Sequence, residues 1–115
     1  MGELEYEEID SVSHAEADVA LRGSDYRLIA RIMIVLGLYD DDWLWVQQRA
    51  LPLLSHDSEI VVSSAILALA HTARVNRSID KGVVIPALQL VAADPRYTGK
   101  VQDAIDDIDI YVISD

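Results

Sequence analysis

The sequence contains no cysteine and no phenylalanine, and only three prolines and five glycines occur among its 115 residues. The absence of cysteine excludes a disulfide framework, a thiolate nucleophile and a cysteine-ligated zinc site. No uninterrupted apolar run approaches the roughly 18 to 20 residues that a membrane-spanning helix needs. The acidic opening segment has neither the basic nor the apolar region of a signal peptide, so we expect a cytoplasmic protein.

Basic side chains are also scarce. Nine lysines and arginines stand against 20 aspartates and glutamates, which leaves a formal net charge of −11. This charge repels phosphate backbones and anionic lipid headgroups and attracts cationic surfaces, so we expect a protein partner, with no nucleic acid and no membrane. The acids gather in residues 1–25 and 94–115, whereas residues 26–93 are neutral. That distribution is typical of a core flanked by solvated surfaces, and equally of an acidic binding face.

The patterns that carry catalysis are missing as well. No glycine-rich phosphate loop, Gly-x-Ser-x-Gly elbow, His-Glu-x-x-His pair or calcium-binding loop occurs. Carboxylate pairs are plentiful, but without a pocket to shift their pKa values they do not indicate acid–base catalysis. Asp40, Asp41 and Asp42 are adjacent rather than alternating, which suits a helix start better than a metal cage. The sequence therefore predicts a binding protein with no enzymatic activity, no cofactor and no metal.

Apolar residues recur with the period of an α-helix, and no hairpin dipeptide or sustained alternation indicates a strand. Short breakers separate six expected helices, at about residues 14–22, 25–38, 43–54, 58–74, 80–93 and 98–112. Ser13 and Glu16 form a capping box for the first helix, and aspartates suit the starts of the next two. Because the loops have two to six residues, successive helices should be antiparallel neighbours. We expect one domain over residues 1–115, with residues 1–12 as an acidic N-terminal segment.

A faint internal repeat relates these helices. The dipeptide Ala-Leu at residues 20–21, 50–51 and 87–88 ends a helix each time and is followed by an aspartate that opens a turn. The spacing of 30 and then 37 residues is typical of helix-pair repeats. The sequence therefore predicts an all-α fold, a short α-solenoid in which three helix pairs stack side by side.

The helical pattern also predicts which side chains are buried. The helix at residues 25–38 is apolar nearly all round and should lie centrally, and the alanines of the helix at 58–74 should allow close helix approach. In the helix at 43–54, a broad apolar arc that includes Leu44 should face the core, with Trp45 on the opposite, exposed side. The alternative is that a neighbouring loop or the N-terminal segment covers Trp45, because a large aromatic ring rarely stays fully solvated.

The last helix has the clearest polar pattern. Asp103, Asp106 and Asp107 project together from the side opposite its apolar face. Near a helix C-terminus they oppose the helix dipole and repel one another. Two interpretations stay open: Arg96, Lys100 or an arginine of a preceding helix neutralises the aspartates, or they recognise a cation, for which arginine or lysine side chains of a partner fit better than a divalent metal.

Residues 45–57 and 61–70 resemble a HEAT repeat, with a helix that ends in leucines, a turn containing aspartate, a valine and an alanine-leucine helix. Residues 85–95 and 103–108 resemble a second copy. The resemblance covers about residues 14–112 and implies a right-handed α-solenoid. Among small bacterial chains of this kind, the sequence is similar to HEAT-like immunity proteins of contact-dependent growth-inhibition and other polymorphic toxin systems. That resemblance implies a cytoplasmic protein that binds one toxin domain, often a basic nuclease, and blocks its active site or substrate groove.

The leading hypothesis is thus a one-to-one binder that neutralises a basic toxin, a ribonuclease or another nuclease. Trp45 would be an aromatic anchor, and the acids at the partner would be Asp41, Asp42, Glu59, Asp103, Asp106 and Asp107. The alternative is a HEAT-like scaffold or regulatory subunit that assembles host proteins, with acidity serving only solubility. A third hypothesis is an enzyme that resembles HEAT-like DNA glycosylases or bilin lyases. The glycosylase type needs a basic groove, which this charge balance does not provide.

Overall fold

The computed structural model describes residues 12–113, and in this range the chain forms six α-helices and no strand. The helices are α1 (His14–Leu21), α2 (Tyr26–Tyr39), α3 (Trp43–Leu53), α4 (Glu59–Asn76), α5 (Lys81–Val91) and α6 (Thr98–Tyr111). Each lies within a few residues of its expected range, so the all-α prediction is confirmed. Within residues 12–113, no helix combines the length and the hydropathy that a membrane-spanning segment requires. The acidic segment expected at residues 1–12 lies outside the described residues, apart from its last one.

Local side-chain caps fix where the first three helices begin. The Ser13 hydroxyl accepts a hydrogen bond from the Glu16 backbone N–H at 3.1 Å, and the Glu16 carboxylate accepts one from the Ser13 N–H at 3.0 Å. This is the capping box that the sequence predicts. The carboxylates of Asp25 and Asp42 cap α2 and α3, each by accepting a backbone N–H of the first turn. Helix α4 ends at Asn76, two residues beyond its predicted end at Arg74. The next residue, Arg77, caps the helix in the left-handed conformation.

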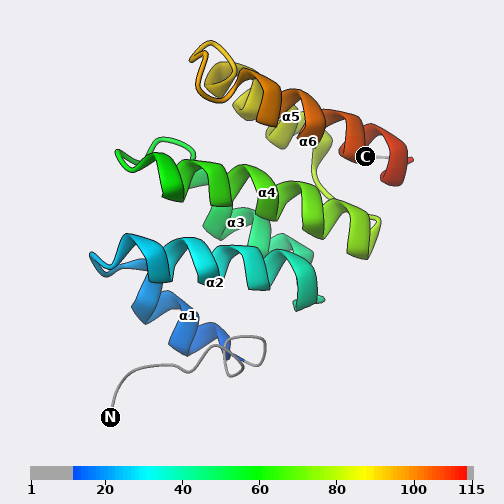
Figure 1. Cartoon of the computed structure of the whole chain (residues 1–115). Helices are drawn as coiled ribbons and strands as arrows, with labels where there is room; N and C mark the ends of the chain where they lie inside the picture. The colour runs from blue at the N-terminus through cyan, green and yellow to red at the C-terminus, as the bar shows by residue number, and fades with distance from the viewer. Residues whose placement is uncertain (1–11, 114–115) are drawn as a thin grey trace.

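The helices form two layers, as Figure 1 shows. Helices α2, α4 and α6 lie side by side in one row and run in the same direction, so each intervening helix returns the chain to the start of the row. Helix α3 packs against α4 and α5 packs against α6, behind the row, while α1 packs against α2 at the outer edge. This is the stacked-pair arrangement expected of a short, solenoid-like all-α fold.

Helix α4 lies at the centre of this arrangement, and the expectation that the helix at 25–38 is central is wrong. Figure 1 places α4 between α2 and α6, and ten of its 18 residues are buried. On α2, Ile34 and Val35 are only half-buried despite their apolar side chains. Helix α2 lies at one end of the row, and its outer flank is covered only by the short α1. The apolar residues on all sides of α2 therefore did not make it the most buried helix. Helix α4 is more buried because its small alanines and serines allow neighbouring helices to pack on three of its sides.

Helix α3 also faces the core with a narrower arc than predicted. Leu44, expected in the core, is 45% exposed. Gln47, by contrast, is buried, and its Oε1 atom accepts a hydrogen bond from the backbone N–H of Asp80 at 2.9 Å. The inward side of α3 is centred on Val46 and Ala50, and Gln47 lies next to them on the helix surface. This buried amide ties α3 to the residue that begins α5.

Candidate partner-binding surface

The residues predicted to bind a partner lie in two separate parts of the structure. Asp103, Asp106 and Asp107 are on α6, with Glu59 at the start of α4. Asp41, Asp42 and Trp45 lie together where α2 leads into α3, since Asp42 caps the turn of α3 that holds Trp45. A partner that touches all seven would have to cover both ends of the helix row.

Helix α6 separates its apolar and acidic sides as the sequence predicts. Ala104 and Ile108 are buried against the neighbouring helices. Asp103 and Asp106 are exposed on the other side, and Asp107 is half-buried at the boundary. The Asp106 carboxylate accepts a hydrogen bond from the side-chain amide of Gln102 at 3.0 Å, one turn before it. The acidic face is therefore solvated and available to a partner.

Neither of the residues expected to neutralise these acids pairs with them. Arg96 turns away, with its Nη2 atom 2.7 Å from Asp94 and its Nη1 atom 3.8 Å from Glu59. Lys100 makes no ion pair with any residue in the range 12–113. Within that same range the three aspartates have no ion-pairing partner either. Among the described residues, the acidic face of α6 thus keeps its full negative charge.

Two hollows follow the outer face of α4 and meet at Leu67; we call them together the α4 groove. The hollow toward α6, of about 120 Å³, is lined by Leu67, Ala70, His71, Lys100, Asp103, Ala104 and Asp107. The hollow toward α2, of about 360 Å³, is lined by Ala30, Ile34, Glu59, Ile60, Ser63, Ser64 and Leu67. Ile60 and Leu67 are 49% and 40% exposed, respectively. The groove therefore has an apolar middle, with carboxylates on its α6 side and at the start of α4.

His71 lies in the α6 hollow of this groove as a neutral imidazole. Burial lowers its pKa below the ordinary histidine value, and the charge of Arg74 lowers the pKa further, while Asp107 raises it by a smaller amount. The Nη2 atom of Arg74 is 3.3 Å from Nδ1 of the ring. At neutral pH the charges that line this hollow are therefore those of Asp103, Asp107 and Lys100.

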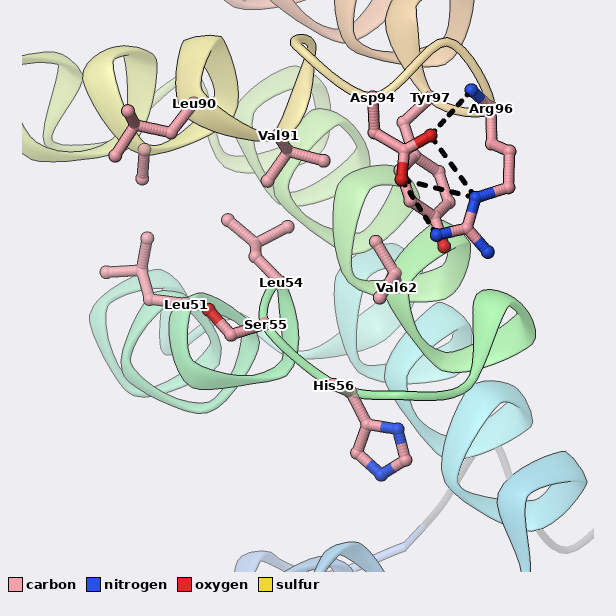
Figure 2. Close-up of a pocket in the computed structure, with 11 residues that line it drawn as sticks. Leu51, Leu54, Ser55, His56, Val62, Leu90, Val91, Asp94, Arg96 and Tyr97 are labelled. Carbon is pink, nitrogen blue, oxygen red and sulfur yellow. Dashed lines mark hydrogen bonds and ion pairs between the residues drawn. The ribbon is translucent and has the colours of Figure 1, made fainter.

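A third hollow, of about 360 Å³, lies where the C-terminal ends of α3 and α5 meet the start of α4. Figure 2 shows its apolar side, which includes Leu51 and Leu90, and the Asp94–Arg96 ion pair at its rim. Leu90 is 81% exposed. Hydrogen bonds from Arg96 hold the pKa of the Asp94 carboxyl below its ordinary value. The sequence pattern around Asp94 indicates only a helix end, and it gave no sign of this hollow.

The side chains of the third hollow do not form a catalytic arrangement. The His56 ring points away from the Asp94–Arg96 pair in Figure 2. Its Nδ1 atom accepts a hydrogen bond from the Ser58 backbone N–H at 2.9 Å, so the ring orders the turn before α4. Ser55 and Tyr97 are the hydroxyl residues that line the hollow, and no hydrogen bond joins either of them to His56 within the described range. The hollow thus offers an apolar surface with a charged rim, and no activated nucleophile.

Trp45 is partly covered, so the expectation that it is exposed is wrong, and the cover comes from helix α1 rather than from the loop or N-terminal segment of the alternative. The His14 imidazole of α1 stacks on the indole with ring centroids 3.7 Å apart and an interplanar angle of 2°. The Arg49 guanidinium lies 4.5 Å from the ring centroid, and its Nε atom is 2.7 Å from Asp18 of α1. Trp45 is half-buried as a result. The signal in the sequence was the helix at residues 14–22, which is close enough along the chain to fold back over α3.

The turn between α2 and α3 uses its aspartates for local structure. Asp42 caps α3 by accepting a hydrogen bond from the Trp45 backbone N–H at 3.1 Å. One oxygen of Asp40 accepts from the Asp42 N–H at 2.8 Å, and its other oxygen lies 2.8 Å from Nε2 of His14. Asp41 is exposed and has no hydrogen bond or ion pair within the described residues. The interpretation of this run as a helix start is therefore confirmed, and only Asp41 is left fully free for a partner.

The part of the chain that the structure describes holds no group of three or more His, Asp or Glu side chains arranged to bind a metal ion.

Comparisons with known proteins provide evidence on the fold. No protein-family profile matches the chain, and no curated protein matches it. The chain is similar to one chain of the crystal structure of a CDI complex from Cupriavidus taiwanensis, with a TM-score of 0.79 and 24% sequence identity. The likeness covers 87% of this chain and 90% of that one, and it shows a shared fold.

Proposed function

We propose that this protein is a non-enzymatic immunity protein that binds one cognate toxin domain in the cytoplasm and neutralises it. The observation that carries the proposal is the shared fold with a chain of a CDI complex over nearly the whole length of both chains. It agrees with the resemblance of the sequence to immunity proteins of contact-dependent growth-inhibition systems. The absence of an activated nucleophile in the third hollow suits a protein that acts by binding.

The charge of the protein supports a basic toxin, a nuclease in particular. A nuclease binds a polyanion and therefore presents cations around its substrate groove. The net charge of −11 steers such a surface toward this protein, and the carboxylates of Asp103, Asp106 and Asp107 can occupy places that phosphates would take. Inhibition would then follow from covering the active site or the substrate groove.

The first experiment is affinity capture of the tagged protein from its native cells, at low and then at moderate salt, with the companions identified by mass spectrometry. The expected result is a single small basic protein, in one-to-one stoichiometry, that stays bound at moderate salt. That protein is then expressed alone and together with this chain. The proposal predicts growth arrest in the first case and recovery in the second, together with inhibition of a nuclease activity in vitro.

Two results contradict the proposal. Capture of several host proteins of moderate affinity would favour the scaffold hypothesis, in which acidity serves only solubility. A basic partner that causes no growth defect, or a defect that co-expression does not relieve, would exclude an immunity role. If co-expression rescues growth from a toxin that has no nuclease activity, the immunity role is supported and the proposal that the toxin is a nuclease is contradicted.

A further inference from the structure

We infer that the α4 groove is the docking surface for the partner, and that it takes a segment in which a lysine or arginine side chain lies next to an apolar one. The inference rests on the proposed function for the identity of the partner. The apolar side chain would lie over Ile60 and Leu67, and the cation would lie between the carboxylates of Asp103 and Asp107.

The apolar part of the argument comes from exposure. Ile60 and Leu67 belong to the most buried helix of the molecule, yet they are 49% and 40% exposed and line the same groove. Ile60 and Leu67 are almost two helical turns apart on the outer side of α4, so they form a strip along its axis. Within the described residues no other helix covers that strip, because α3 packs on the opposite side of the row. An apolar side chain placed there would bury both leucine and isoleucine surface.

The cationic part comes from charge complementarity in the same groove. Asp103 and Asp107 lie one turn apart on α6 and line the hollow that begins at Leu67. Neither makes an ion pair within the range 12–113, and Asp107 is half-buried, where a charge interaction is screened less than at a fully exposed site. The stem of a lysine or arginine side chain can pack on Leu67 and Ala70 while its charged head lies between the two carboxylates.

One resident cation competes for this place. Lys100 lines the same hollow, one turn before Asp103, and is exposed. His71 is neutral at pH 7, because burial lowers its pKa, and so it does not compete there. Arg74 lies against His71, with 3.3 Å between its Nη2 atom and Nδ1 of the ring. The Lys100 ammonium group therefore repels a cation that enters the same hollow, and removal of its charge should strengthen binding.

The test follows the backbone amide signals of the intact protein by NMR during titration with N-acetyl-leucyl-arginine amide. The control ligand is the citrulline analogue, which has the same shape and no charge. The expected result is saturable shifts confined to α4 and α6 around Leu67, with the citrulline analogue binding roughly threefold to tenfold more weakly, the range that two partly exposed charge pairs produce. Shifts scattered over the surface, or equal shifts with both ligands, would overturn the inference.

Variants make the test specific to this groove. Asp103→Asn with Asp107→Asn, and separately Leu67→Ala, should weaken the arginine ligand by a similar factor, whereas Lys100→Gln should tighten its binding. Asp41→Asn with Asp80→Asn changes the net charge equally at exposed positions that do not line the groove and should have little effect. Equal weakening by both double variants would mean that only overall charge matters, which contradicts a built site. The amide spectrum of each variant without ligand shows whether it remains folded.

The same variants separate this inference from the proposed function. If the captured toxin is neutralised equally well by the wild type and by the Asp103→Asn, Asp107→Asn and Leu67→Ala proteins, the immunity role stands and the groove is not the interface. If the peptide binds the groove but no toxin is captured, the docking surface stands and the function is a different one. Concentration-dependent shifts of the groove signals without any ligand would identify a second copy of the chain as the occupant and overturn the inference.

Discussion

Gly37 of α2 packs directly against the backbone of Ala68 in α4. A methyl group placed on Gly37 would lie 2.8 Å from both the Cα atom and the carbonyl oxygen of Ala68, and 3.1 Å from Cβ of His71. These distances are shorter than van der Waals contact, and backbone atoms cannot rotate away. The absence of a side chain at Gly37 thus sets how closely the two most extensively packed helices approach each other.

Gly37→Ala should therefore destabilise the protein although alanine is the better helix former. The helical preference alone favours the variant by about 1 kcal/mol, but the enforced separation of α2 from α4 costs about 1–3 kcal/mol for overpacking. We expect a lower urea midpoint and a lower melting temperature. Gly99→Ala is the matched control, since nothing lies within 4 Å of its added methyl group, and it should be neutral or stabilising. Equal stability changes in both variants would show that the close approach does not matter.

Trp45→Ala should loosen α1. The indole holds α1 through its stack on His14 and its contact with Arg49, so truncation should lower the free energy of unfolding by about 2 kcal/mol, less than for a fully buried tryptophan. Hydrogen exchange should show faster exchange of the α1 amides than of the α4 amides. His14→Ala provides the milder comparison. If Trp45→Ala leaves α1 protected and weakens only the binding of a partner, the residue is an interface anchor instead.

The stability of the protein should depend on pH through His71. Because burial lowers the pKa of this imidazole in the folded state, the unfolded chain binds the proton more tightly. The contribution of neutral His71 to the free energy of unfolding is therefore complete above its unfolded-state pKa of about 6.5. It is lost as the pH falls from there toward the lower pKa of the folded state. His71→Gln should flatten the dependence in that window. In NMR titrations the midpoint of His71 should lie below 6.5, and Asp107→Asn should lower it further, because that carboxylate raises the pKa.

The aspartates of α6 should reduce stability while they speed association. Replacing Asp103, Asp106 and Asp107 together by asparagine removes their mutual repulsion and their unfavourable interaction with the helix dipole, which should stabilise the free protein by a few tenths of a kcal/mol per site. The same variant should bind a basic toxin with a smaller association rate constant and a flatter salt dependence, measured by stopped-flow fluorescence. Unchanged association kinetics would remove these residues from the interface.

Gln47→Leu should destabilise the connection between α3 and α5. The leucine keeps the approximate size of the side chain but leaves the Asp80 backbone N–H without the acceptor that lies 2.9 Å away. A lost partner for a partly buried backbone donor costs about 1–3 kcal/mol. Gln48→Leu changes the neighbouring, exposed glutamine and should have a much smaller effect on thermal unfolding. Similar losses in both variants would contradict a specific role for the buried amide.

The six helices and their starts could be predicted from the sequence, because they depend on interactions within a few residues. The Ser13–Glu16 capping box and the Asp25 and Asp42 caps are local, and the apolar period of α6 already separated Ile108 from the aspartates. The alanines of α4 likewise indicated close helix packing. Each of these inferences needs only the fixed geometry of a single helix.

Which helix faces pack together and which stay exposed could not be predicted in the same way, because this depends on how distant helices meet. Trp45 stacks on His14, Gln47 bonds to Asp80 and Leu44 lies outside the core, because the rotation of α3 depends on helices distant along the chain. The α4 groove combines residues of three helices, and no local pattern places Leu67 beside Asp103. Arg96 could pair with any of several acids by sequence, and the fold brought it to Asp94 and Glu59, which left the acids of α6 without it.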